Sequence, residues 1–83
     1  MKTLINDLRA AILATEQDVL GVKGAIAGAD LTERPGVPAG APAADRGEML
    51  ANVTLAYRHL EDARMRLGKV IQAYDGGVSV YKG

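Results

Sequence analysis

The chain has 83 residues, a formal net charge of zero and no cysteine. A chain this short forms one domain at most, with a core too small to be stable alone. Ten basic residues balance ten acidic ones, which opposes a general DNA-binding or membrane-surface protein. The absence of cysteine excludes disulfides and thiolate metal sites and fits a cytoplasmic protein.

The first predicted element is a helix over about residues 3–27. Its apolar residues recur at alternating spacings of three and four, the heptad pattern of a helix that packs against another helix. One row of this stripe is Ile5, Ile12, Val19 and Ile26, and the other is Met1, Leu8, Thr15 and Val22. Thr3 is the expected N-terminal cap.

Residues 28–44 are predicted to form a flexible loop. Three prolines in this segment, Pro35, Pro38 and Pro42, remove backbone donors and disfavour helix at the residues before them. The dipeptide Pro35–Gly36 signals a turn. A loop of this length in a small domain is either functional or flexible, and its composition favours flexibility.

The second predicted helix covers about residues 46–75. Asp45 followed by Glu48 resembles a capping box, and Gly76–Gly77 is expected to end the helix, since glycine adopts the left-handed cap conformation. The heptad stripe is Met49, Val53, Ala56, Leu60, Ala63, Leu67, Val70 and Tyr74. Residues 76–83 follow as a C-terminal arm, either a short strand or an extended segment.

Further apolar residues lie outside both stripes. They are Leu4, Ala11, Leu13, Leu20, Leu50, Leu55, Tyr57, Met65 and Ile71. Second apolar faces on the helices of so short a chain indicate contact with other copies. The expected fold is therefore all-α, a two-helix antiparallel hairpin that assembles into a compact homo-oligomer.

The residues that usually perform catalysis are scarce. His59 is the only histidine, which excludes a multi-histidine metal site within one chain, and the only serine lies in the C-terminal arm. Glu61 and Asp62 are adjacent, about 100° apart around a helix, and do not converge on one point. Asp62 is instead expected to pair with Arg58 and Arg66. The chain is predicted not to be an enzyme and to need no cofactor or metal.

Basic side chains are the better candidates for binding. They are Arg9, Lys23, Arg58, Arg64, Arg66 and Lys69. Tyr57 and Arg64 lie seven residues apart on one helix face, where an aromatic ring and a guanidinium can stack a base and hold a phosphate. Oligomer packing with a solvated arginine explains the same pair. In an oligomer, symmetry repeats each charge, so an anion site needs no net positive charge on the monomer.

Residues 55–73 resemble one helix of a known phage family. The string is Leu-Ala-Tyr-Arg-His-Leu-Glu-Asp-Ala-Arg-Met-Arg-Leu-Gly-Lys-Val-Ile-Gln-Ala, and its most characteristic part is His-Leu-Glu-Asp-Ala-Arg-Met, residues 59–65. It is similar to the C-terminal helix of the small anti-CBASS sponge proteins, which are related to the anti-Thoeris sponges. The resemblance covers roughly the last third of the chain well and the first helix only in outline.

Membership of this family implies a compact homohexamer of helical hairpins in the host bacterial cytoplasm. Such a hexamer would sequester cyclic dinucleotides and, in separate pockets, cyclic trinucleotides, without cleaving them. It would thereby block CBASS-type antiviral signalling. Arg64, Arg66 and Lys69 lie inside the matching string. With Arg9, Tyr57 and Tyr81 they are the six candidate ligand-binding residues.

The chain departs from the family near its start. Relatives carry an aromatic, basic element ahead of or early in their first long helix, whereas residues 3–27 contain no aromatic residue. The base-stacking ring then comes from Tyr57, Tyr74 or Tyr81, or the dinucleotide pocket is altered or absent. Tyr81 is the candidate for an arm that closes over a ligand, with a frayed tail as the other interpretation. The alternative function is a non-catalytic structural or protein-interaction oligomer without a nucleotide ligand.

Overall fold

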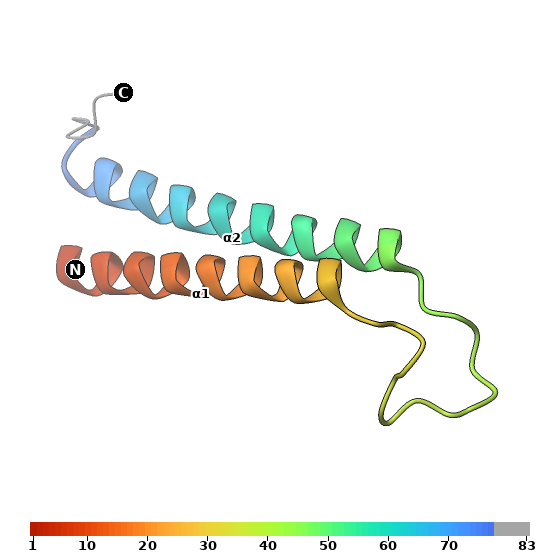
Figure 1. The fold of residues 1–83 in the computed structure, drawn as a ribbon. Helices are drawn as coiled ribbons and strands as arrows, with labels where there is room; N and C mark the ends of the chain where they lie inside the picture. The colour runs from red at the N-terminus through yellow and green to blue at the C-terminus, as the bar shows by residue number, and fades with distance from the viewer. Residues whose placement is uncertain (78–83) are drawn as a thin grey trace.

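The computed structural model describes residues 1–77, which form two helices joined by a long loop (Figure 1). Helix α1 spans Lys2–Gly28 and helix α2 spans Arg46–Tyr74. The helices lie side by side and antiparallel, so the N-terminus is next to the end of α2 (Figure 1). This confirms the predicted helical hairpin. Neither helix combines the length and apolar character needed to cross a membrane.

The helix boundaries fall within one residue of those predicted, but the two N-termini are built differently. At α2 the Asp45 carboxylate accepts a hydrogen bond from the backbone N–H of Glu48 at 2.9 Å, which confirms this cap. At α1 the first helical residue is Lys2, and no side chain caps the preceding Met1. The predicted cap at Thr3 is therefore wrong, because Thr3 already lies within the first helical turn.

Two glycines end α2. Gly76 has φ 77° and Gly77 has φ 86°, a conformation that residues with a Cβ rarely adopt. The N–H of Gly77 donates to the carbonyl of Gln72 at 2.8 Å, and the N–H of Gly76 donates to that of Ala73. These bonds satisfy carbonyls that the helix end would leave unpaired. The predicted glycine stop is confirmed, and the rest of the predicted arm, 78–83, lies outside the described residues.

The loop between the helices contains a turn at Pro35–Gly36, as predicted. The N–H of Val37 donates to the carbonyl of Arg34 at 3.1 Å, and Gly36 has φ 82°, as a type II turn requires at that position. The Arg34 guanidinium also donates to the carbonyl of Pro42 at 2.8 Å. The loop therefore folds back on itself.

Arg46, the first residue of α2, joins the two helices at their loop end. Its guanidinium donates to the carbonyls of Ile26, Ala27 and Ala29 at 3.0, 2.7 and 2.8 Å. The last carbonyls of a helix have no partner inside the helix, and a cation there also balances the helix dipole. Arg46 thus closes the end of α1.

Replacing Arg46 is expected to loosen the loop end of the hairpin. Arg46→Met should lower the free energy of unfolding by about 1.5–3 kcal/mol, because the α1 carbonyls lose a charged donor. Urea denaturation at fixed protein concentration measures this loss. Arg34→Met is the matched control and should cost about 0.5 kcal/mol or less, since the hydrogen bond of Arg34 to Pro42 stays within the exposed loop. Equal losses for the two variants would contradict the capping role.

The interface between the helices confirms one row of each predicted stripe. Its half-buried or buried members are Ile5, Ile12, Val19 and Ile26 on α1, and Val53, Leu60 and Leu67 on α2. Different residues complete the interface. They are Arg9 and Glu16 on α1, and Leu50, Tyr57, Arg64 and Ile71 on α2. Among the described apolar residues only Ile5 and Ile71 are fully buried, 7% and 3% exposed.

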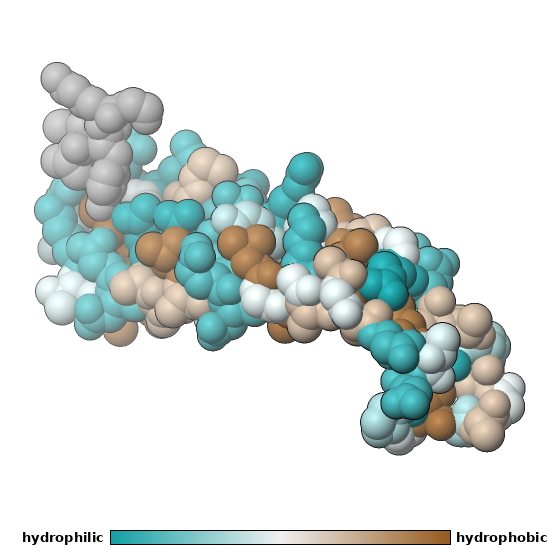
Figure 2. All heavy atoms as spheres, in the orientation of Figure 1, coloured by the Kyte–Doolittle hydropathy of each residue, from teal (hydrophilic) through white to brown (hydrophobic). Residues whose placement is uncertain are grey.

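The second predicted row of each helix stays outside this interface. Exposed members include Met1, Leu8 and Val22 on α1 and Met49, Ala56, Ala63 and Val70 on α2. Their placement between the two helices is therefore a wrong prediction. Residues three and four positions after Ile5 flank it on opposite sides of the helix. The heptad pattern predicts that the Leu8 side of α1 packs against α2. In the structure the side that carries Arg9 and Glu16 packs there instead. Figure 2 shows apolar and polar side chains interspersed at the surface of both helices.

Candidate functional site

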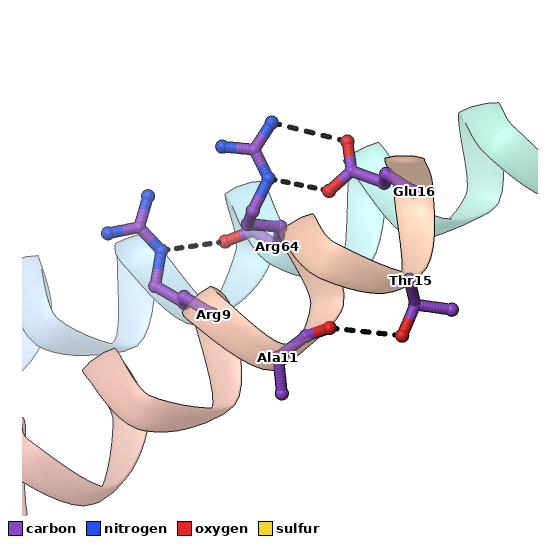
Figure 3. Close-up of polar contacts among 5 residues, drawn as sticks. All are labelled: Arg9, Ala11, Thr15, Glu16 and Arg64. Carbon is purple, nitrogen blue, oxygen red and sulfur yellow. Dashed lines mark hydrogen bonds and ion pairs between the residues drawn. The ribbon is translucent and has the colours of Figure 1, made fainter. Parts of the chain in front are cut away.

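Glu16 and Arg64 form an ion pair between the two helices (Figure 3). Nε of Arg64 donates to Oε2 of Glu16 at 2.7 Å, and Nη2 donates to Oε1 at 3.3 Å. The Glu16 side chain is 0% exposed and that of Arg64 is 32% exposed. Two parallel bonds hold the guanidinium and the carboxylate in one plane. The pair therefore orients the Arg64 guanidinium at the surface of the hairpin.

Arg9 of α1 lies next to this pair. Its Nε donates to the backbone carbonyl of Arg64 at 3.1 Å (Figure 3). Its guanidinium passes close to Gly68, where a Cβ would stand 3.3 Å from Nη2. Such a contact is tighter than a side chain normally makes, so the glycine leaves room for Arg9. Two guanidinium groups from different helices thus meet on one side of the hairpin.

The surroundings of Arg64 favour its charged form. The hydrogen bonds that Arg64 donates to Glu16 raise the pKa of Arg64 above its usual value, more than burial lowers it, and the charges of Glu16 and Glu61 raise it further. Arginine is already protonated at all physiological pH values. Arg64 therefore presents a permanent positive charge held by a fixed carboxylate.

Arg9, Glu61, Arg64 and Met65 line an open pocket of about 270 Å³. Ligand pockets usually measure about 300–1,000 Å³, so this one holds part of a ligand of dinucleotide size. The guanidinium groups can donate hydrogen bonds to phosphate oxygens, and the exposed Met65 offers apolar surface to a flat ring. With Glu16, the cluster carries two positive and two negative charges and is formally neutral.

The structure brings together two of the six predicted ligand residues, Arg9 and Arg64. Tyr57 is half-buried on α2, one heptad before Arg64, and does not line the pocket. Tyr57 packs within the hairpin, whereas the packing interpretation placed it at an oligomer contact beside a solvated Arg64, and Arg64 is instead paired with Glu16.

Of the other three predicted ligand residues, Arg66 and Lys69 do not line the pocket. Arg66 is exposed, and its Nε pairs with Asp62 at 3.1 Å, which confirms that predicted ion pair. Lys69 is exposed on α2. Tyr81 lies outside the described residues.

The sequence analysis did not identify Glu16 as a functional residue. It therefore did not predict the ion pair that holds the Arg64 guanidinium in place. Glu16 follows Arg9 by one heptad and occupies a position next to the apolar row of α1. A charged residue at such a position is a signal for a partner of opposite charge on the facing helix. Glu61 and Met65 complete the pocket, and the sequence alone indicates only a surface charge at the first and a surplus apolar residue at the second.

No protein-family model, no curated protein and no solved structure matches the chain, so a function for it has to be argued from its own residues.

Proposed function

We propose that this protein binds cyclic dinucleotides and cyclic trinucleotides and sequesters them without cleavage, as a phage protein that silences CBASS-type signalling in the bacterial cytoplasm. The observation that supports it most is the convergence of Arg9 and Arg64, from different helices, on one open pocket. The resemblance of residues 55–73 to the sponge family suggests the ligand class, because Arg64 lies inside the matching string.

In the proposed complex, Arg9 and Arg64 donate hydrogen bonds to a phosphate of the ligand. Glu16 engages Nε and Nη2 of Arg64, and no hydrogen bond of Nη1 is found within residues 1–77. That nitrogen is therefore available to an anion in the pocket. A base packs on the exposed side chain of Met65.

Assembly supplies the remaining contacts. The pocket of one chain is smaller than a cyclic dinucleotide needs, so the proposed ligand spans pockets of neighbouring copies in a homo-oligomer, a hexamer if the family resemblance holds. A small cyclic anion needs only a few charge-assisted hydrogen bonds, unlike a long polyanion. The zero net charge of the chain is compatible with the first and opposes the second.

Calorimetric titration with a panel of cyclic di- and trinucleotides, at known oligomer mass, tests this proposal. The wild type should bind at least one of them at micromolar concentration, and the ligand recovered after heat release should be unmodified. Arg9→Met should weaken binding by about 10–100-fold, the loss expected for a charged donor to a phosphate. Circular dichroism shows whether the variant keeps its helices.

Arg66→Met is the matched control, because it removes an exposed arginine that already pairs with Asp62. Its affinity should stay within about twofold of the wild type. No binding by a correctly assembled oligomer would exclude the proposed function. Weaker binding by Arg66→Met together with unchanged binding by Arg9→Met would place the ligand elsewhere on the protein.

A second candidate is a structural or protein-interaction oligomer without a nucleotide ligand. The specific observation in its favour is the formal neutrality of the cluster, since Glu16 already balances the charge of Arg64. The same titration separates the two candidates, because only the first predicts heat of binding that depends on Arg9.

A further inference from the structure

Glu61 is the pocket residue whose role phosphate binding does not explain. It lines the pocket together with Arg9, Arg64 and Met65 and is half-buried on α2. Its charge favours the protonated form of Arg64, but no hydrogen bond or ion pair of its carboxylate is found within residues 1–77. A carboxylate repels a phosphate at close range. Glu61 therefore weakens an anion site unless its oxygens accept hydrogen bonds from another part of the ligand.

The pocket has different chemistry at its two ends. The Arg9 guanidinium passes close to Gly68, and Glu61 precedes Gly68 by seven residues, about 10 Å along the axis of α2. Seven residues are close to two full turns, so Glu61 and Gly68 lie on the same face of the helix. Arg64 and Met65 lie on this face between them. The pocket therefore has a guanidinium at one end, a carboxylate at the other and an apolar side chain between the two.

This arrangement suits the chemistry of one nucleotide. A nucleotide has an anionic phosphate at one end, a flat base at the other and a ribose between them. Figure 3 shows the guanidinium groups of Arg9 and Arg64 on the same side of the hairpin, where both can donate to one phosphate. A base that packs on Met65, one helical turn after Glu61, has its edge towards the Glu61 carboxylate. In this pose the base edge, and not the phosphate, contacts Glu61.

A carboxylate selects among bases because it can only accept hydrogen bonds. Guanine has two donors side by side on its Watson–Crick edge, the ring N–H and the 2-amino group, which match the two carboxylate oxygens. Adenine and cytosine have an amino donor beside a bare ring nitrogen, and that nitrogen would face an acceptor. Uracil has one N–H between two carbonyls. Among the four common bases, only guanine can therefore make two hydrogen bonds with one carboxylate through this edge.

We propose that Glu61 accepts hydrogen bonds from the Watson–Crick edge of a guanine base, so that the pocket selects guanine-containing cyclic nucleotides over those that contain only adenine. The inference rests on the proposed function and names the class of ligand and the residue that selects it. Glu16 then pairs with Arg64, the phosphate accepts from the two arginines, and guanine donates to Glu61. A formally neutral cluster is compatible with such a ligand, which brings both an anion and a pair of donors.

Calorimetric titration of the full-length wild type with cyclic diguanylate and cyclic diadenylate, at known oligomer mass, tests the inference. Cyclic diguanylate should bind about 10–100-fold more tightly, the discrimination expected of one bidentate contact with a base edge. The inosine analogue of cyclic diguanylate lacks only the 2-amino groups, so its base has one donor fewer for Glu61. It should bind about 10-fold more weakly than cyclic diguanylate.

Glu61→Gln distinguishes recognition of a base from repulsion of a phosphate. The amide keeps the size of the side chain but presents one acceptor and one donor, a pattern that suits adenine better than guanine. The variant should bind cyclic diguanylate at least about 10-fold more weakly than the wild type does. It should bind cyclic diadenylate as tightly as the wild type or more tightly. If Glu61 acted only through its charge, both ligands would bind more tightly to the variant.

Asp62→Asn is the matched control, since it changes a carboxylate to an amide at the next residue. Asp62 is exposed and pairs with Arg66, and it does not line the pocket. Both affinities of this variant should therefore stay within about twofold of the wild type. Circular dichroism shows whether the two variants keep their helices.

The outcomes separate this inference from the proposed function. Equal affinities of the wild type for cyclic diguanylate and cyclic diadenylate, or equal changes of both affinities in Glu61→Gln, would overturn the role of Glu61 and leave the proposed function standing. Equal binding of cyclic diguanylate and its inosine analogue would overturn that role as well. A wild type that binds neither dinucleotide would also exclude the guanine contact, and titration with cyclic trinucleotides then decides whether the proposed function fails with it.

Discussion

Arg64→Met should lower the free energy of unfolding by about 3 kcal/mol or more, the largest loss among the polar variants. The Glu16 carboxylate, whose side chain is 0% exposed, would stay buried without its partner. Truncating one member of a buried ion pair costs about 3–5 kcal/mol, because the remaining charge has lost its hydration and finds no replacement. Urea denaturation at one protein concentration measures the loss.

Replacing both members tests the reason for this loss. The double variant Glu16→Leu with Arg64→Met should recover most of the stability, since apolar side chains of similar size often replace a buried pair without loss. Arg66→Met, whose pair with Asp62 is exposed, should cost less than about 0.5 kcal/mol. A double variant as unstable as Arg64→Met alone would show that the loss comes from packing rather than from the unpaired carboxylate.

Ile71→Ala should cost about 3 kcal/mol of unfolding free energy, the second large effect. Ile71 is 3% exposed and is one of only two described apolar residues that are fully buried. Deleting its outer carbons removes apolar contact and leaves a cavity, and such truncations cost about 2–5 kcal/mol. A hairpin with so small a core has few other contacts that could compensate.

Leu55→Ala is the matched control for Ile71→Ala, because Leu55 lies on the same helix and is half exposed. Its cost should stay below about 1 kcal/mol. Thermal unfolding followed by circular dichroism at 222 nm gives both values. Similar losses for the two variants would mean that Leu55 is buried in an assembly of hairpins and that the contact between α1 and α2 is not the main source of stability.

The sequence by itself determined the helices and where they end. Local signals suffice for this: the Asp45 side chain can cap only a helix that follows it, and Gly76 and Gly77 adopt a conformation that residues with a Cβ rarely take. The heptad spacing also identified one apolar row of each helix, with Ile5 on α1 and Leu60 on α2. These features depend on neighbours within a few positions, so periodicity and cap chemistry can show them.

Only the tertiary structure decided which side of each helix faces the other. The rows of Leu8 and Glu16 flank the same apolar row, and periodicity favours the more apolar of the two. The hairpin instead faces the row of Glu16 towards Arg64, 48 residues away in the chain, because a buried carboxylate needs a cation that only the facing helix supplies. That choice brings Arg9 beside Arg64 and leaves the Leu8 row exposed. The composition of this short, neutral chain indicates no partner, whereas its fold places an arginine pocket on one side of the hairpin and, among residues 1–77, the exposed Leu8 row on the other.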